Sequence, residues 1–315
     1  MLLTDYFYSD RDATWDFALA SGVRHGVIRL PERPDFDPGD FSQMRAVYDK
    51  FNAAGLRPVV VEPMPNALHD PIKAGLPGRD AAIEKVIAMM ANMDKLDLRT
   101  ICFNFMAHVG WTRTTDKIPA RGGACVTGFR LADFKAETAP VTHEEMWQNY
   151  EYFLKAVLPY AEKYGVRLAL HPDDPPLPEL GNTARILTSA DAFRKAMALV
   201  PSDWLGVTFC QANFVLMGED LYRLIPEWKD KIFFVHFRNV EGQKTDFHET
   251  FHDEGAIEMG RVLRCYVENG VDVPVRVDHV PTYPTGDQQQ VAGYGAIGRL
   301  FAIGYLKGLL EGIEK

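Results

Sequence analysis

Eight short apolar runs alternate along the chain with amphipathic helical segments. The runs are centred near Leu3, Ile28, Val60, Phe103, Leu168, Val207, Val235 and Val275. Most of them are continuously apolar, which is typical of strands that are covered on both faces in a parallel sheet. Eight such strands, each followed by a helix, predict an α/β fold, the closed (β/α)8 TIM barrel. An open doubly wound sheet is the main alternative, but no G-x-G-x-x-G motif follows the first strand.

The clearest helical segment spans residues 142–165. Thr142 and Glu145 form a capping-box pattern at its start, and Gly165 suits the position that ends a helix. Apolar residues recur between them at helical spacing, so one face of this helix is expected to pack on the barrel.

Two stretches, at about 63–79 and 107–140, match neither pattern. Both follow the carboxyl end of a predicted strand, where barrel enzymes build their active sites. The second is long enough to form a functional cover. With 315 residues, the chain fits one barrel domain over residues 1–315 that carries these two long loops.

Composition and charge narrow the classes of partner. The formal net charge is −9 and no block of Lys or Arg occurs, which argues against a nucleic-acid partner but leaves a small anionic substrate open. The N-terminus MLLTDYFYSD lacks the pattern of a signal peptide, and no window resembles a membrane helix. The four cysteines form no C-x-x-C motif, so we expect a reduced, cytoplasmic protein.

Polar residues that bind metals stand at the ends of four consecutive apolar runs. These residues are His171, Cys210, His236 and Asp278. Each has an ordinary explanation by itself, as a buried thiol, a core imidazole or a helix cap. In a parallel barrel, however, all four would surround the same opening. The sequence therefore predicts a centre for a borderline divalent ion such as Mn, Fe, Co or Zn rather than Mg or Ca.

Several motifs around these residues resemble the mannonate dehydratase family. They are HPDDPP (171–176), TFC (208–210), VHFRNV (235–240), R-x-D-H (276–279), FNFMAHVGWTRT (103–114), FHETFHDEG (247–255), IKAGLPGRD (72–80) and the closing GYGAIGRLFAIGYLKGLLEG (293–312). The resemblance covers nearly the whole chain. It implies a xylose isomerase-like barrel, one Mn2+ or Fe2+ ion with Zn2+ or Co2+ as alternatives, and a homodimer. It also implies dehydration of D-mannonate to 2-keto-3-deoxy-D-gluconate in hexuronate catabolism, with the same four ligands.

The chain departs from the family's usual motifs close to these ligands. Gly110 precedes Trp111 where the family usually has Asp, and Gln211-Ala212-Asn213 follows the cysteine in place of Thr-Gly-Ser. Val280 follows His279 where the family has Gly, and Leu-Pro-Arg-Ile is replaced by the sequence at 183–186. The four expected metal ligands are kept while the residues next to them differ, so the sequence does not decide which sugar acid is the substrate.

Dehydration of a sugar acid requires removal of a proton beside a carboxylate, so negative charge builds up in the transition state. A metal ion can spread this charge, while a base and an acid transfer the protons. We assign the proton transfers to His279 and Tyr294. Arg113 and Arg238 are expected to hold the substrate carboxylate because a planar guanidinium matches it, and Asn104 is the third expected substrate-binding residue.

Two further groups call for a choice between roles. Asp173 and Asp174 are adjacent on a proline-rich turn, so their side chains diverge, which disfavours a paired-carboxylate glycosidase. We expect Asp173 to orient the metal ligands by hydrogen bonds. His248 and His252 have the i, i+4 spacing of a zinc pair, but neither is expected to be a primary ligand. The resemblance places His252 in the FHETFHDEG loop, and we expect it to support the ligands.

Three other functions are alternatives to the dehydratase. A metal-dependent isomerase or epimerase on the same barrel would be favoured by another carboxylate at a strand end, such as Glu62. A barrel nuclease is disfavoured by the net charge of −9. A metal-binding protein that has lost dehydratase activity is suggested by the changed neighbours Gly110, Gln211 and Val280.

Overall fold

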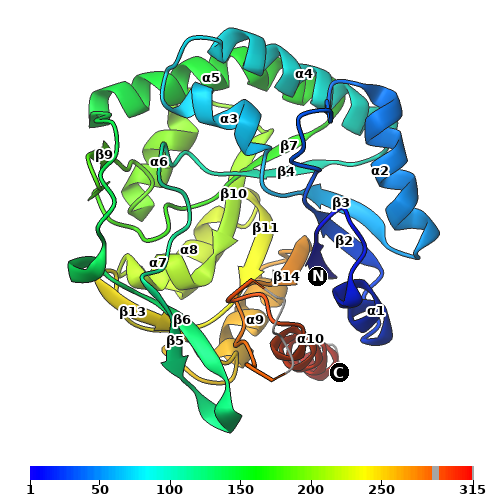
Figure 1. The fold of residues 1–315 in the computed structure, drawn as a ribbon, viewed down its shortest axis with the longest axis vertical. Coiled ribbons are helices and arrows are strands. Elements are labelled where there is room, and N and C mark those ends of the chain that lie inside the picture. The colour runs from blue at the N-terminus through cyan, green and yellow to red at the C-terminus, as the bar shows by residue number, and fades with distance from the viewer. Residues whose placement is uncertain (286–290, 314–315) are drawn as a thin grey trace.

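The eight predicted strands form a closed parallel barrel in the computed structural model, which describes residues 1–285 and 291–313 (Figure 1). Around the barrel the order is β1-β14-β11-β10-β7-β4-β3-β2. The strands are β1 (Leu2–Phe7), β2 (His25–Ile28), β3 (Arg57–Val61), β4 (Thr100–Phe103), β7 (Arg167–Leu170), β10 (Leu205–Cys210), β11 (Ile232–Phe237) and β14 (Pro274–Val277). The (β/α)8 prediction is thereby confirmed.

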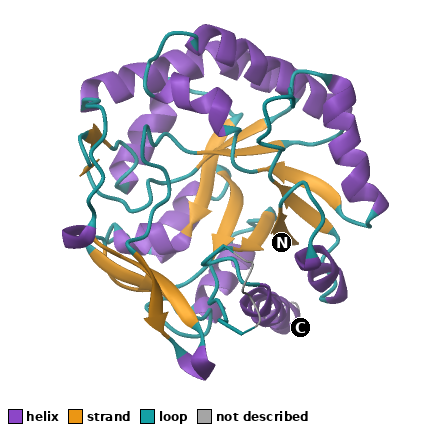
Figure 2. Ribbon diagram, viewed as in Figure 1, coloured by secondary structure: helices purple, strands orange, loops and turns teal. Residues whose placement is uncertain are grey.

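Helices surround the barrel on its outer side (Figure 2). They are α1 (Ala13–Ala20), α2 (Phe41–Ala53), α3 (Asn66–Lys73), α4 (Arg79–Lys95), α5 (His143–Tyr164), α6 (Ala190–Leu199), α7 (Gln211–Leu216), α8 (Leu221–Trp228), α9 (Met259–Glu268) and α10 (Ala296–Ile313). The predicted capping box of α5 is present: the Thr142 side chain accepts from the Glu145 backbone, and the Glu145 carboxylate accepts from the Thr142 backbone. In the described ranges no helix is long and apolar enough to cross a membrane.

Two insertions after barrel strands form a second, antiparallel sheet outside the barrel (Figure 1). Its order is β12-β13-β6-β5, with β5 (Thr115–Pro119), β6 (Cys125–Arg130), β12 (Val240–Gln243) and β13 (Asp246–Glu249). A two-stranded sheet joins β8 (Glu179–Leu180) to β9 (Thr183–Ala184). The stretches 63–79 and 107–140 are therefore not irregular throughout, since they contain α3 and the β5–β6 hairpin. Local sequence could not reveal that this hairpin joins a larger sheet, because β6 also pairs with β13, more than a hundred residues later.

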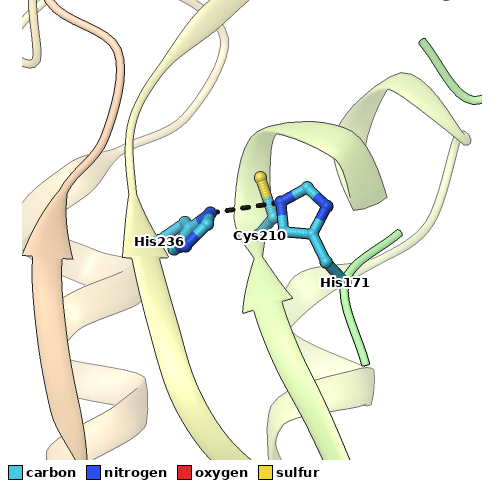
Figure 3. A group of neighbouring side chains, drawn as sticks. All are labelled: His171, Cys210 and His236. Carbon is cyan, nitrogen blue, oxygen red and sulfur yellow. Dashed lines mark hydrogen bonds between the residues drawn. The ribbon is translucent and has the colours of Figure 1, made fainter. Parts of the chain in front are cut away.

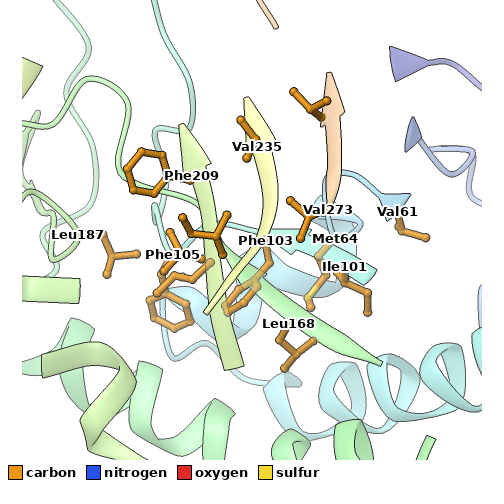
Figure 4. Packing of buried hydrophobic residues seen from close by; sticks show 14 of the residues in the cluster. Val61, Met64, Ile101, Phe103, Phe105, Leu168, Leu187, Phe209, Val235 and Val273 are labelled. Carbon is orange, nitrogen blue, oxygen red and sulfur yellow. The ribbon is translucent and has the colours of Figure 1, made fainter. Parts of the chain in front are cut away.

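The barrel strands separate two apolar layers by the alternation of their side chains. One cluster fills the barrel and includes Tyr6, Val27, Val60, Cys102, Ala169, Phe233 and Phe234. The larger cluster packs between the strands and the helices, with Val61, Leu168, Phe209 and Val235 among its members (Figure 4). Because side chains alternate with a period of two, the residue two positions beyond an interior residue reaches the carboxyl mouth of the barrel. This rule places Glu62, Asn104 and His171 at the mouth.

Candidate metal centre and active site

The donor atoms of His171, Cys210 and His236 lie within 4.8 Å of one another (Figure 3). His171 Nε2 is 3.1 Å from His236 Nδ1, and Cys210 is the register partner of His236 on the neighbouring strand. Asp278 approaches the same atoms, with its Oδ2 3.4 Å from His236 Nδ1. The four strand-end residues therefore converge at one mouth of the barrel.

Both imidazoles are oriented by a hydrogen bond on the nitrogen that faces away from this cluster. His171 Nδ1 is 2.7 Å from the carbonyl oxygen of Pro172, and His236 Nε2 is 2.9 Å from Glu62 Oε1. Each ring thus presents its other nitrogen to the shared space. Histidines that bind metals have this arrangement, because the outer acceptor fixes the tautomer and the ring plane. The set of donors present fits a divalent cation.

Nearby cations favour the thiolate form of Cys210. Burial opposes ionisation of this thiol, but Arg238, whose Nε is 3.3 Å from Sγ, together with the two imidazoles lowers the pKa of Cys210 to about 5. Asn213 Nδ2 adds a contact to the sulfur at 3.5 Å. The sulfur is therefore ready to act as a charged ligand at neutral pH.

The buried ion-pair network around the donors carries excess negative charge. Four carboxylates and the Cys210 thiolate face three guanidinium groups; the carboxylates belong to Glu62, Asp174, Glu249 and Asp278, and the guanidiniums to Arg113, Arg238 and Arg276. With neutral imidazoles the surplus is two negative charges. Burial of uncompensated charge is costly, and one divalent ion would balance this cluster.

Above the donors lies a cavity of about 440 Å³. His171, His236 and Asp278 line one side of it, and polar side chains from the β2 and β3 side line the other. That second group comprises Arg29, Asn66, Asp70 and Lys73. The cavity is large enough for a sugar acid and has polar groups on both sides.

Comparison with known proteins shows the family. The family model described as D-mannonate dehydratase (UxuA) matches residues 7–139 and 130–315. The chain belongs to the mannonate dehydratase family. The mannonate dehydratase of Streptococcus equi subsp. zooepidemicus is 31% identical over 293 residues, which cover 82% of this chain and 79% of that protein. Mannonate dehydratase 1 of Bacillus licheniformis is 30% identical over 332 residues, covering 93% and 90%.

Solved structures agree with this family assignment. The crystal structure of mannonate dehydratase from Streptococcus suis serotype 2 superposes with a TM-score of 0.90 at 28% identity, covering 99% of this chain and 93% of that one. A xylose isomerase domain protein from Planctomyces limnophilus shares the fold, with a TM-score of 0.64 at 15% identity and coverage of 99% and 98%. The relatives indicate that this mannonate dehydratase family member is an enzyme of the hydro-lyase class.

In this family member His279 and Tyr294 both line the cavity. His279 Nδ1 is 3.0 Å from Glu249 Oε1, and its Nε2 is 3.7 Å from Asp278 Oδ1. The ring centroids of His279 and Tyr294 are 5.4 Å apart. Burial and the negative charge of Asp278 raise the pKa of Tyr294 far above its usual range, so its phenol keeps its proton.

Arg113 and Arg238 are not among the residues that line this cavity, although they were expected to hold the substrate carboxylate. Arg113 contacts Asp174 Oδ1 at 2.6 Å and also Glu249. Arg238 contacts the same two carboxylates at 2.7 and 2.8 Å, and Asp278 at 2.9 Å. Both guanidiniums are buried and engaged by carboxylates of the chain, so their role here is to fix the wall behind the donors. Asn104 does line the cavity.

Asp174, rather than Asp173, joins the charged network. Asp173 Oδ2 accepts from the Leu187 backbone at 2.9 Å and so ties down the loop after β7, while burial raises its pKa. His252 Nε2 is 2.7 Å from the carbonyl oxygen of Phe237, so it contacts the end of the strand that carries His236. Their expected effect on the ligands stays a prediction.

Sequence reasoning did not assign four members to this network: Glu62 and Asp174, which it considered in other roles, and Glu249 and Arg276. The alternation of inward and outward side chains along a strand could have identified Glu62 and Arg276. Arg276 lies on an inward-facing position of a barrel strand, and Glu62 lies just beyond one. Glu62, Cys102 and His236 also bring donor atoms together. Arg276, however, lies 2.8 Å from Glu62 and 3.3 Å from His236 Nε2, and burial raises the pKa of Cys102 to about 12. We therefore interpret that second group as support for His236 and not as a metal centre.

The departures from the family motifs differ in their access to substrate. Gln211 and Val280 are buried, and Gln211 Nε2 donates to the carbonyl of Arg238 at 3.1 Å. Gly110 instead lines the cavity, and a Cβ at this position would meet nothing within 4 Å. Of these three, only Gly110 changes the surface that a substrate would contact.

Proposed function

We propose that this chain catalyses the dehydration of D-mannonate to 2-keto-3-deoxy-D-gluconate. The observation that carries the proposal is the convergence of His171, Cys210, His236 and Asp278 beside one cavity, whose lining includes the two histidines, Asp278, His279 and Tyr294. These four residues would hold one divalent ion, Mn2+ or Fe2+. When bound, that ion supplies Lewis-acid stabilisation of the negative charge that develops on the substrate.

The two cavity groups divide the proton transfers. His279 donates its Nδ1–H to Glu249, which leaves Nε2 free to accept the proton from the carbon next to the substrate carboxylate. Tyr294, which keeps its phenolic proton, donates it to the departing hydroxyl. The C–H and C–O bonds break, water leaves, and the resulting enol converts to the keto acid.

The remaining cavity wall binds the rest of the substrate. Arg29 lines the cavity and is partly exposed; its Nη1 lies 3.3 Å from the Tyr6 hydroxyl and its Nη2 pairs with Glu32. Unlike Arg113 and Arg238 it faces the cavity, so it can also reach an anionic group there. Lys73 is buried and paired with Asp70 at 2.8 Å, and both line the same side with Asn66. These groups match the hydroxyls of a hexonate, and Arg29 takes over the carboxylate role first expected of Arg113 and Arg238.

Metal analysis followed by a panel of sugar acids tests the proposal. The purified protein, loaded with Mn2+ or Fe2+, is expected to release a keto-deoxy acid from D-mannonate, detected with a carbonyl reagent. If only another hexonate loses water, the proposed reaction would stand and the proposed substrate would be wrong. Isomerised or epimerised sugar without water loss would favour the isomerase, although Arg276 and His236 already engage Glu62. Metal binding with no reaction on any acid would favour a binding protein.

A further inference from the structure

Glu249 is a buried carboxylate that comes from outside the barrel. It ends β13 in the antiparallel sheet, yet its Oε1 lies 3.0 Å from Nδ1 of His279, which follows the barrel strand β14. Its Oε2 lies 2.8 Å from Arg238, and Arg113 contacts Oε1. Burial opposes ionisation, but the two guanidiniums and the His279 hydrogen bond lower the pKa of Glu249 to about 2, so it is a carboxylate at neutral pH.

The His279 ring is enclosed by neighbours that leave one nitrogen for chemistry. Trp111 lies 4.9 Å away and Tyr294 5.4 Å away, measured between ring centroids. Nδ1 faces the Glu249 carboxylate, which can only accept a hydrogen bond. The proton of a neutral ring is therefore held on Nδ1, and Nε2 is left unprotonated beside Asp278 and the cavity.

We propose that Glu249 is a positioning residue, which orients His279 and fixes its Nδ1–H tautomer so that Nε2 receives the substrate proton. This inference rests on the proposed function, because it assigns the base of that reaction. Without Glu249, the imidazole could rotate or place its proton on Nε2, and either change would remove the base while the four donor residues stay in place.

The proposal also gives the antiparallel sheet a role in the reaction. β13 pairs with β6 and β12, and Cys125 of β6 forms a bridge with Thr282 in the segment after β14. The sheet thus contacts the His279 segment both through backbone pairing and through the Glu249 side chain. The antiparallel sheet therefore connects both barrel insertions to the imidazole ring of His279.

Kinetics of matched variants give the first test. In Glu249→Ala we expect kcat to fall about 10²-fold and in Glu249→Gln about tenfold, since glutamine keeps an acceptor but loses the charge; supporting residues of this kind typically contribute 10–100-fold. KM for D-mannonate and metal content should stay within about twofold. Asp246→Asn is the control, because Asp246 lies on the same strand but forms an exposed pair with Arg130. An unchanged kcat, or a loss of kcat that matches a loss of metal, would overturn the proposal.

Nitrogen NMR of 15N-histidine protein loaded with diamagnetic Zn2+ gives a readout independent of turnover. The His279 signals, assigned by their absence in His279→Gln, should show a protonated Nδ1 and an unprotonated Nε2 in the wild type and in Asp246→Asn. Glu249→Ala should show mixed tautomers; an unchanged tautomer overturns the proposal. If Glu249→Ala does not fold, the kcat of Glu249→Gln decides. If the wild type dehydrates no sugar acid while the tautomer still depends on Glu249, the proposed function fails and the ring orientation by Glu249 is kept.

Discussion

At the scale of single residues, two buried cysteines show how neighbours decide chemistry. Cys102 and Cys210 are both enclosed near the barrel axis. Burial and the negative charge of Glu62 raise the pKa of Cys102 to about 12, whereas Arg238 and two imidazoles overcome burial and lower that of Cys210 to about 5. The thiols are chemically identical, so only their surroundings select Cys210 as the charged donor.

Replacement of Cys210 should therefore reduce metal content and activity together. We expect Cys210→Ser and Cys210→Ala to lose at least 10–100-fold in metal affinity, because serine is poorly ionised and alanine has no donor. The fold should persist, as judged by circular dichroism. Metal should protect Cys210 from alkylation, and Cys265→Ala serves as the control. Full metal occupancy in Cys210→Ala would leave a centre of His171, His236 and Asp278.

Glu62 should influence the metal through His236. Glu62→Gln keeps the size of the side chain but removes the charge that faces His236 Nε2 at 2.9 Å. We expect metal affinity to fall about 10–100-fold, measured by competition with a chelator. The exposed Glu32 provides the matched Glu32→Gln control. Equal affinities in the two variants would show that the imidazole is oriented by other contacts.

At the scale of elements, the period of two along a strand explains what the sequence could predict. Cys210, His236 and Asp278 interrupt or follow apolar runs on the inward side, so their convergence could be read from a barrel prediction. The joining of the two hairpins into one antiparallel sheet could not be predicted in this way, since β6 and β13 pair across more than a hundred residues. Glu249 was missed for this reason. The sequence also could not show that Arg113 and Arg238 face carboxylates of the chain.

The N-terminus of α5 offers a test of local stability separate from the site. Thr142→Ala removes the side-chain oxygen that accepts from the Glu145 backbone. We expect the free energy of unfolding to fall by about 1 kcal/mol, measured by urea denaturation. Metal affinity and kcat should not change, because α5 begins outside the cavity lining. Thr142→Ser, which keeps the acceptor, should restore most of the loss; equal stability of both variants with the wild type would contradict a stabilising cap.

At the scale of the whole molecule, the net charge of −9 conceals a dense buried network. Its carboxylates come from β13 and from the segments that follow β3, β7 and β14, so no local window of sequence displays the network. Because arginines hold these groups ionised, the fold itself depends on their remaining charged.

Acid should therefore destabilise the metal-free protein. The pKa of Glu249 is lowered to about 2 in the folded chain, against about 4.3 for an exposed glutamate. Its contribution to stability is complete above about pH 5 and is lost as the pH falls toward 2, amounting to roughly 3 kcal/mol. Urea denaturation between pH 7 and pH 3 measures this dependence. Glu249→Gln should show a shallower slope, and an identical slope would contradict the ionised carboxylate.

The last barrel strand has a consequence for the synthesis of the chain. β14 pairs with β1, the first of the barrel strands to be made, and its end leads directly into Asp278. A nascent chain can therefore neither close the barrel nor complete the set of four donors until Asp278 has left the ribosome. Metal retention would thus report that the first and last barrel strands have met, and a truncated chain that lacks β14 should lose both properties in a single step.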